Sequence, residues 1–336
     1  MGGIMRTIRH SDLNDEVHAN KLAGLATMIW GPPGQGKSEA AYAGAKQDNA
    51  KLFEIRANLF DPVDVRGGLK VVEQEDGSYK TRYGIPEDYP PTNSLEPVWL
   101  LIDELPNAPK STQNALLQLI LDRRIGTYEL PKNCCIVAAG NRAEDRAAVH
   151  EMPTPVKDRF AHYTLESNID DWVAWALKNN IDESIIAFLR YRPGLLSDID
   201  ASQNAFPTPR AWAMLNKKLP FVKNMFYGCA SLIGDGPAGE YIAFRNIYKD
   251  IPDLDKLVKN PTSTKVPTDP SVLFAICGGL ATRVNDATFA NIMKYVKRIP
   301  REFQIIIVKD ALAKDTNLIT STSYTKWITD NADVLL

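Results

Sequence analysis

The fold is decided by one stretch of the chain, Gly31-Pro32-Pro33-Gly34-Gln35-Gly36-Lys37-Ser38, which directly follows the apolar run at residues 25–30. The stretch fits the phosphate-binding pattern G-x-x-x-x-G-K-[S/T] at every fixed position. A buried strand that ends in glycines lets consecutive backbone N–H groups curl around a polyphosphate, and the helix expected at residues 39–45 points its positive end at the same anion. We therefore predict a phosphate-binding loop, in which Lys37 reaches the outer phosphates and Ser38 holds a magnesium ion. The alternative is a glycine turn without a ligand.

Length and charge narrow the class of protein. A chain of 336 residues favours two domains, or one domain with a large appendage. The 39 Lys and Arg nearly balance the 41 Asp and Glu, which disfavours nucleic acid or an anionic membrane as the partner of the whole molecule but leaves a local basic patch open. The four cysteines are too few and too scattered for a disulfide framework, and no apolar stretch is long enough to span a bilayer. We expect a soluble, cytoplasmic protein.

The hydrophobic pattern changes near residue 166. Before this point, apolar runs alternate with amphipathic stretches, which is typical of a parallel sheet with helices on both faces. Beyond it, apolar residues recur at helical spacing without convincing alternation, and a proline- and threonine-rich segment at 259–270 is the expected linker. The predicted strands lie at 25–30, 52–57, 98–103, 134–139 and 162–165, and the predicted helices of the second half at 170–179, 181–191, 210–218, 289–298 and 302–313.

A second motif lies at residues 97–104, which read Pro-Val-Trp-Leu-Leu-Ile-Asp-Glu. The uninterrupted apolar run indicates a strand buried on both faces. Its carboxylates, Asp103 and Glu104, would emerge at the edge where open α/β sheets bind ligands. Asp103 can then hold the magnesium ion, while Glu104 is placed to orient and deprotonate a water for attack on the γ-phosphate. An ordinary acidic strand end is the alternative.

Three further residues complete the pattern. Asn141 ends the run Ala-Ala-Gly-Asn, where its amide can hold the same water if the strands are neighbours. Arg159 lies in Pro-Val-Lys-Asp-Arg-Phe, just before the last predicted strand. Arg210 lies in Pro-Thr-Pro-Arg-Ala-Trp, where Thr208 would cap a helix and Pro209 would open it.

Together, GPPGQGKS, LLIDE, AAGN, DRF and PTPRAW resemble the AAA+ ATPases, and within them the MoxR group with its CbbQ and NorQ type activators, over about residues 20–215. The hydrophobic pattern and the resemblance together predict a five-stranded parallel core at 1–166 and a helical lid at 167–258, and the hydrophobic pattern predicts a C-terminal helical extension at 271–336, beyond the match. The resemblance implies an ATP-hydrolysing enzyme that uses Mg²⁺ and forms a homo-oligomeric ring, usually a hexamer. The resemblance also implies roles for single residues. Those that bind ATP are Gly31, Pro32, Pro33, Gly34, Gln35, Gly36, Lys37, Ser38, Asp103 and Arg210, the last as the sensor 2 residue, and Ser38 and Asp103 also bind the metal ion. The catalytic residues are Glu104 as the base, Asn141 as the sensor 1 residue and Arg159 as the arginine finger for the neighbouring subunit.

The segment between the second predicted strand and the strand that ends at Asp103 is long, and part of it is hairpin-like. Residues 69–83 form a hairpin-like run with Asp76-Gly77 at its turn, and a proline-rich stretch follows at 84–97. In the MoxR group this region carries an insertion within helix two that faces the ring pore, so it resembles an element that grips a substrate. A solvated surface hairpin is the alternative. Residues 123–130 likewise resemble the hairpin that precedes sensor 1.

The resemblance also implies a protein client and a partner with a von Willebrand factor A domain. Two other functions remain open. One is a DNA-directed motor, such as a helicase loader or translocase subunit, in which the basic residues Arg66, Lys70, Lys80 and Arg82 touch phosphates. The other is a scaffold whose assembly is controlled by ATP binding rather than turnover. The match departs from the family beyond about residue 225, and the glycine-rich residues 234–241 are interpreted as a turn that caps a helix.

Overall fold

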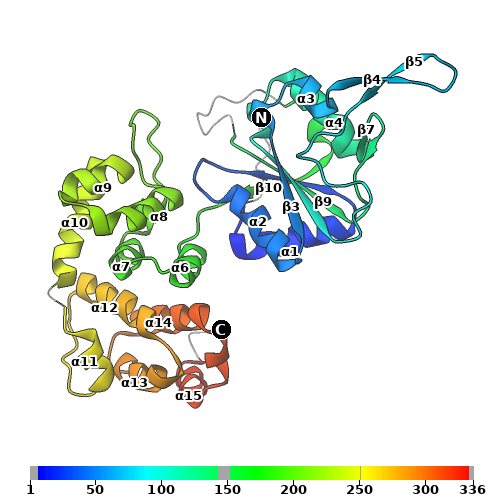
Figure 1. The fold of residues 1–336 in the computed structure, drawn as a ribbon. Helices are drawn as coiled ribbons and strands as arrows, with labels where there is room; N and C mark the ends of the chain where they lie inside the picture. The colour runs from blue at the N-terminus through cyan, green and yellow to red at the C-terminus, as the bar shows by residue number, and fades with distance from the viewer. Residues whose placement is uncertain (1–6, 143–151, 250, 333–336) are drawn as a thin grey trace. The chain divides into compact units, whose positions relative to one another are not determined.

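A computed structural model describes residues 7–142, 152–249 and 251–332. The chain divides into two compact units, Met1–Glu166 and Ser167–Leu336 (Figure 1). The first unit contains the sheet, and the regular elements among the described residues of the second unit are all helices. Among the described residues, no helix combines the length and the apolar character that crossing a bilayer would require.

The first unit is built on a parallel sheet of six strands in the order β1-β10-β2-β9-β6-β3. This confirms the predicted α/β class, and each predicted strand is present to within two residues at either end. The expected number of strands, five, was wrong, because β1 adds a sixth at the edge beside β10. A strand of two residues is too short to leave an alternating pattern in the sequence. The strands are β1 (Thr7–Ile8), β2 (Ala26–Trp30), β3 (Lys51–Arg56), β6 (Val98–Asp103), β9 (Cys134–Gly140) and β10 (Phe160–Leu165).

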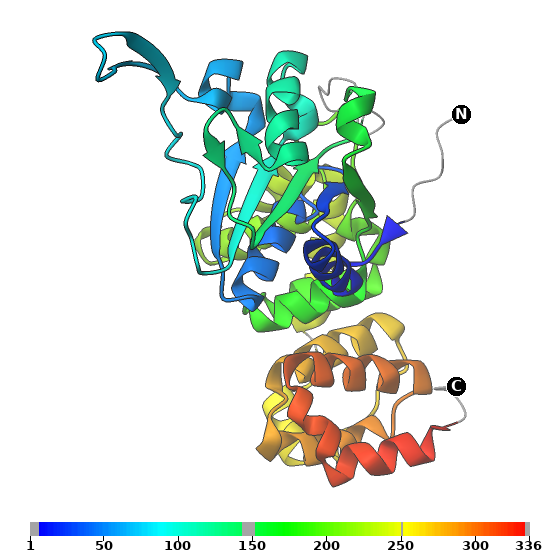
Figure 2. The same ribbon diagram turned by 90° about the vertical axis from the view of Figure 1, so that its right-hand side faces the viewer.

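Helices cover both faces of this sheet (Figures 1 and 2). Along β6, Leu100 and Ile102 join the hydrophobic cluster on one face, while Trp99 and Leu101 join the cluster on the other. Successive side chains of a strand point to opposite faces, so a run without polar residues is needed where both faces are covered. The first cluster packs under α3 (Pro62–Arg66), α4 (Lys110–Asp122) and α5 (Thr154–Lys157), and the second under α1 (His10–Leu22) and α2 (Lys37–Gln47).

The predicted hairpin is present and projects from the body of the unit (Figure 1). It consists of β4 (Leu69–Glu73) and β5 (Tyr79–Tyr83), joined by a turn in which Gly77 has φ +76°. The short helix α3 precedes it, and residues 84–97 return to β6 without a helix. The hairpin therefore does not interrupt a longer helix, which differs from the expected insertion within helix two. The second predicted hairpin is formed by β7 (Arg124–Ile125) and β8 (Tyr128–Glu129).

The second unit contains two hydrophobic clusters that share helix α12. Ala275 and Ala281 of α12 belong to one cluster, and Leu273 and Ile276 to the other. Gly234 ends α9 with φ +82° and α10 begins at the next residue, so most of the predicted turn at 234–241 is helix. The helices are α6 (Ile169–Lys178), α7 (Glu183–Tyr191), α8 (Pro209–Lys218), α9 (Met225–Ile233), α10 (Asp235–Lys249), α11 (Leu254–Lys259), α12 (Pro270–Arg283), α13 (Asp286–Val296), α14 (Arg301–Lys314) and α15 (Thr322–Asp330).

A buried ionic cluster connects three helices of this unit. Arg190 of α7 forms ion pairs with Asp170 of α6 and Asp310 of α14. The side chains of Arg190 and Asp310 are only 8% and 2% exposed. Burial raises the pKa of Asp310 to about 6, although the nearby guanidinium of Arg190 acts in the opposite direction. The cluster therefore fixes α14 against α6 and α7.

Candidate active site

The loop at residues 31–38 leaves β2 and ends where α2 begins at Lys37. Gly34 and Gly36 have φ values of +77° and +83°, in the left-handed region that residues with a side chain rarely adopt. Gly36 is also the N-cap of α2, so the first N–H groups of this helix open toward the loop. The glycines of the motif are therefore required by the backbone path, and the loop has the form of an anion cradle.

Lys37 lies almost fully inside this loop. Its ammonium group donates hydrogen bonds to the carbonyl oxygens of Gly31 at 2.8 Å and Pro32 at 2.9 Å. A third bond, at 2.8 Å, joins it to the side-chain oxygen of Asn141. The structure thus brings Lys37 and Asn141, which are 104 residues apart in the sequence, into direct contact.

Ser38 and Asp103 form the second contact of the site. The hydroxyl of Ser38 donates to Oδ2 of Asp103 at 2.8 Å, and the other carboxylate oxygen accepts from the backbone N–H of Glu104 at 2.9 Å. A hydroxyl and a carboxylate at this distance are hard oxygen ligands of the kind that Mg²⁺ takes alongside phosphates and water. Glu104 itself has φ +55°, an uncommon conformation for a residue with a side chain, and such residues concentrate at functional sites.

Strand order explains why these residues meet. β9 lies between β2 and β6, so the carboxyl ends of the three strands are neighbours at one edge of the sheet. The N–H of Gly31 donates to the carbonyl of Gly140 at 3.3 Å, which ties the loop to the end of β9. A Cβ at Gly140 would lie only 2.2 Å from the ring of Pro106, so any larger residue here would force this edge of the sheet to shift. The edge matches the place where open α/β sheets bind ligands.

Residues 26–160 match the family model described as AAA domain (dynein-related subfamily). The first unit contains an AAA+ ATPase domain. Domains of this kind bind ATP, typically with Mg²⁺. The structure gathers Lys37, Ser38 and Asp103 at one edge of the sheet, and their roles toward that ligand stay predictions.

Several solved structures show a weak overall similarity to this chain. The RuvB Holliday junction branch migration motor of Thermotoga maritima shares 16% identity over 86% of each chain, with a TM-score of 0.40. NtrX from Brucella abortus shares 14% identity over 98% of this chain and 69% of its own, with a TM-score of 0.39. A DNA polymerase III gamma subunit-related protein of Thermotoga maritima shares 12% identity over 97% of this chain and 91% of its own, with a TM-score of 0.36. These scores are too low to indicate what this chain acts on. No curated protein matches the chain in sequence.

Arg159 of the AAA+ domain lies at the opposite edge of the sheet from the loop. It directly precedes Phe160, which pairs with Ala26 at the amino end of β2. The phosphate loop begins after Trp30, five residues beyond Ala26. Because a strand rises about 3.3 Å per residue, about 16 Å separates the amino edge of the sheet from the edge that carries the loop. Arg159 pairs with Asp158 at 3.1 Å, remains 40% exposed, and lines a groove of about 320 Å³. The guanidinium therefore does not serve the loop of its own chain.

Arg210 belongs to the second unit. As the sequence predicted, Pro209 opens α8, and the hydroxyl of Thr208 accepts from the N–H of Ala211 at 3.0 Å. This cap places the exposed Arg210 in the first turn of the helix. Its approach to a bound nucleotide stays a prediction.

Two residues near the site of the AAA+ domain were missed from the sequence. The ring Nε2 of His10 lies 2.8 Å from the carbonyl oxygen of Gln35 in the loop.

The second of these residues is Arg56, at the end of β3. It is the register partner of Asp103, and its guanidinium pairs with the carboxylate of Glu54 at 2.9 Å. Glu54 also accepts from Tyr42, and this hydrogen bond raises the pKa of the Tyr42 hydroxyl to about 12. No motif marks these positions, because the approach of His10 to Gln35 and of Arg56 to Asp103 arises only in the folded chain.

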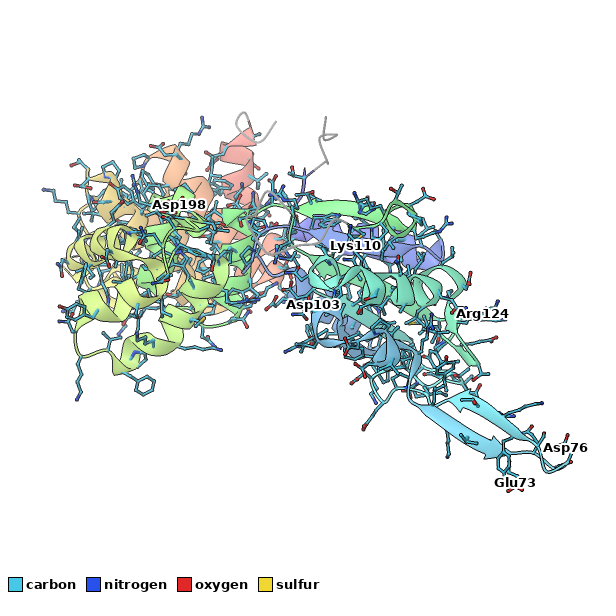
Figure 3. The ribbon with its side chains drawn as sticks, turned by 90° about the horizontal axis from the view of Figure 1, so that it is seen from above. Glu73, Asp76, Asp103, Lys110, Arg124 and Asp198 are labelled. Atoms are coloured by element: carbon cyan, nitrogen blue, oxygen red, sulfur yellow. The ribbon has the colours of Figure 1, made fainter. Side chains whose placement is uncertain are left out.

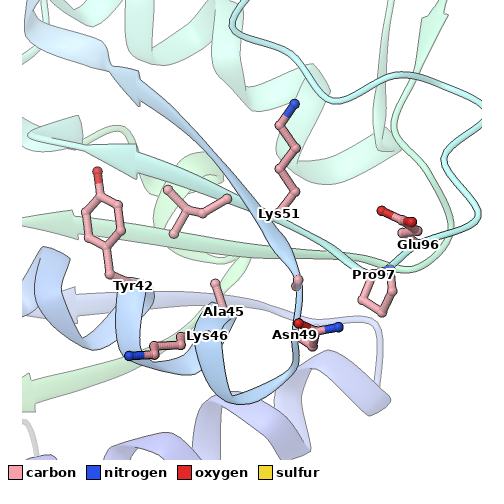
Figure 4. Close-up of a pocket in the computed structure, with 9 residues that line it drawn as sticks. Tyr42, Ala45, Lys46, Asn49, Lys51, Glu96 and Pro97 are labelled. Atoms are coloured by element: carbon pink, nitrogen blue, oxygen red, sulfur yellow. The ribbon is translucent and has the colours of Figure 1, made fainter.

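A larger groove of about 590 Å³ lies along the end of α2 and the start of β3 (Figure 4). Lys46, Lys51 and Glu96 supply its charged side chains. None of the predicted site residues lines it. Its size alone therefore does not make it the centre of the chemistry, and the contacts of Lys37 and Asp103 define the candidate site better (Asp103 is labelled in Figure 3).

Proposed function

We propose that this protein is a magnesium-dependent ATPase of the MoxR type, which assembles into a ring and remodels a protein or protein complex. A partner with a von Willebrand factor A domain and a hexameric ring belong to the same proposal. The observation that carries it is the pair of contacts Lys37–Asn141 and Ser38–Asp103 at one edge of the sheet, together with Arg159 at the opposite edge.

The residues of the site have distinct roles in this proposal. Lys37 and the N–H groups of the loop bind the phosphates, while Ser38 and Asp103 hold the metal ion. Bound Mg²⁺ neutralises charge on the phosphate oxygens during transfer. Glu104 orients a water and accepts its proton, and Asn141 fixes the position of that water. Because hydrolysis by such sites depends mainly on positioning and charge stabilisation, each of these side chains acts through its geometry.

The position of Arg159 supports a ring. An arginine supplied by a neighbouring subunit can accelerate phosphoryl transfer by roughly three to five orders of magnitude. Arg159 is too far from its own loop to act there, and its guanidinium is exposed at the other edge of the sheet. A head-to-tail contact between the two edges must either close into a ring or grow into a filament, and closure gives the proposed assembly.

The hairpin supports contact with a client. Its register places residues of odd number on one face, where Leu69 lies opposite Tyr83 and Glu73 opposite Tyr79. Leu69, Val71 and Tyr79 are each more than 60% exposed. Below the hairpin, a Cβ on Gly67 would lie 1.7 Å from the carbonyl oxygen of Gly84, so the base is tightly packed. The exposed Leu69, Val71 and Tyr79 on one face of a projecting arm fit contact with a polypeptide client.

The opposite face favours the DNA-directed motor as a second candidate. Lys70 pairs with Arg82, and Lys80 extends the same basic face. The tip is acidic, however, with Glu73 and Asp76 at its far end (Figure 3). Binding to single- or double-stranded DNA that weakens steeply with salt, and that is lost in Lys70→Glu/Arg82→Glu, would favour this second candidate. Weak retention that is unaffected by the double substitution would favour the protein client.

Mixing of subunits tests the proposed function. We expect Arg159→Ala to bind ATP normally but to lose most of its hydrolysis, and Glu104→Gln to do the same for a different reason. Rings that contain both variants include some interfaces with an intact base and an intact arginine, so mixing restores part of the activity. Lys132→Ala, which removes another exposed cation at the amino edge of the sheet, is the matched control and keeps full activity. Failure of activity to recover at any mixing ratio, despite demonstrated co-assembly, would count against a shared site.

A further inference from the structure

The phosphate loop is held from outside by the N-terminal segment of the same unit. His10 is the first residue of α1, and its ring Nε2 lies 2.8 Å from the carbonyl oxygen of Gln35. The same ring covers Gly36, where a Cβ would lie 3.2 Å from Cε1 of His10. A carbonyl oxygen only accepts hydrogen bonds, so Nε2 of His10 must carry the proton and donate it.

This contact sets the direction of one peptide unit. In a planar trans peptide, the carbonyl of residue 35 and the N–H of residue 36 point in opposite directions. With the Gln35 oxygen directed at His10, the N–H of Gly36 points away from His10 and into the loop. Backbone N–H groups turned inward in this way are what a phosphate-binding loop uses to hold its anion.

His10 is also tied to the end of the sheet. Two residues earlier, Ile8 pairs with Leu165, and the N–H of Glu166 donates to the carbonyl of Ile8 at 3.0 Å. Glu166 is the last residue of the first unit. A Cβ on Gly31 would lie 3.3 Å from the carbonyl oxygen of Leu165, so the end of β10 also packs directly on the start of the loop.

From these contacts we propose that His10 is a positioning residue for the phosphate loop, and that residues 7–10 form a strap between the loop and the end of β10. The strap orients the Gly36 N–H for the anion, and it transmits occupancy of the loop to the β1–β10 pairing just before the chain enters the second unit. This inference rests on the proposed nucleotide site, and it adds a residue to that site that no motif contains.

Two substitutions at His10 separate its packing from its hydrogen bond. His10→Phe keeps a ring over Gly36 but removes the donor, and His10→Gln restores a donor at similar reach. We expect His10→Phe to weaken ATP binding about three- to tenfold, the size of one hydrogen bond, while the rate of hydrolysis at saturating ATP stays unchanged. His10→Gln should recover most of the affinity. His18→Phe, on the same helix and 54% exposed, is the control and should bind ATP as the unmodified protein does.

Amide hydrogen exchange provides a readout that does not depend on ATP hydrolysis. Without nucleotide, residues 31–38 should exchange faster in His10→Phe than in the unmodified protein and in His10→Gln. With ATP, the N–H of Glu166 should gain protection in the unmodified protein but not in His10→Phe. Equal ATP affinity and equal exchange in all three proteins would overturn the inference while leaving the proposed function intact. If the unmodified protein bound no ATP, the proposed function would fail, and exchange in the loop would still decide whether His10 positions it.

Discussion

The two units bury their cations in different surroundings. Lys37 of the first unit contacts two backbone carbonyl oxygens and the amide of Asn141, all of them on loops at the edge of the sheet. Arg190 of the second unit lies between the carboxylates of Asp170 and Asp310, which are carried by two helices packed against its own. Uncharged acceptors on loops can give way to an incoming anion, whereas carboxylates on packed helices cannot. The first arrangement suits binding, and the second suits a fixed helical framework.

The largest effect is expected from Arg190. Arg190→Met leaves Asp310 buried beside an apolar side chain, and breaking a buried pair in this way costs about 3–5 kcal/mol. Urea unfolding followed by tryptophan fluorescence measures it, since Trp172, Trp212 and Trp327 lie in this unit. Arg192→Met removes an exposed pair with Glu240 and should cost about 1 kcal/mol or less. A loss in Arg190→Met no larger than in this control would refute the fixed framework.

The same cluster should give the second unit a distinct pH dependence. Asp310 has a folded pKa of about 6 against a usual value of 3.8, so between these values the folded state binds the proton more tightly than the unfolded state. Its contribution to the free energy of unfolding is therefore full below about pH 4 and is lost as the pH rises through 6, by about 3 kcal/mol. Unfolding measured from pH 4 to 7, relative to Asp310→Asn, shows this slope. A difference between the two proteins that does not vary with pH would contradict it.

In the first unit, Lys37→Ala should weaken ATP binding about a hundredfold, because it removes a charge-assisted contact with the phosphates. Its effect on unfolding should be smaller than that of Arg190→Met, which sharpens the contrast between the two cations. Equilibrium binding of a fluorescent ATP analogue measures the affinity. Lys46→Ala, an exposed cation in the last turn of the same helix, is the control and should bind normally.

A smaller effect is expected at Gly140, which supports the position of Asn141. Gly140→Ala places a methyl group 2.2 Å from the ring of Pro106, and overpacking of this kind costs about 1–3 kcal/mol. We expect a lower midpoint of unfolding together with weaker ATP binding. Gly236→Ala, where a Cβ meets no atom within 4 Å, should be neutral or slightly stabilising. Equal midpoints for the two variants would show that the sheet edge yields easily at this point.

Much of the first unit was predictable because its signals are local. Leu100, Leu101 and Ile102 mark a strand covered on both faces, and Gly77 with Asp76 marks the turn of the hairpin. The motif at 31–38 predicted its own loop, and Thr208 with Pro209 predicted the start of α8. Strand β1 was missed because two residues carry no period, and the hairpin does not interrupt a helix as the resemblance implied. The boundary between lid and C-terminal extension stays a prediction.

The sequence by itself determined which residues have the chemistry for a nucleotide site: a glycine loop with Lys37 and Ser38, and carboxylates at Asp103 and Glu104. Such information is local, because backbone path and side-chain chemistry are set by a few consecutive residues. Only the tertiary structure decided that Asn141 reaches Lys37, that Arg159 faces away from its own loop, and that His10 holds Gln35. These relations depend on the order of strands in the sheet, which is fixed by packing among segments far apart in the chain.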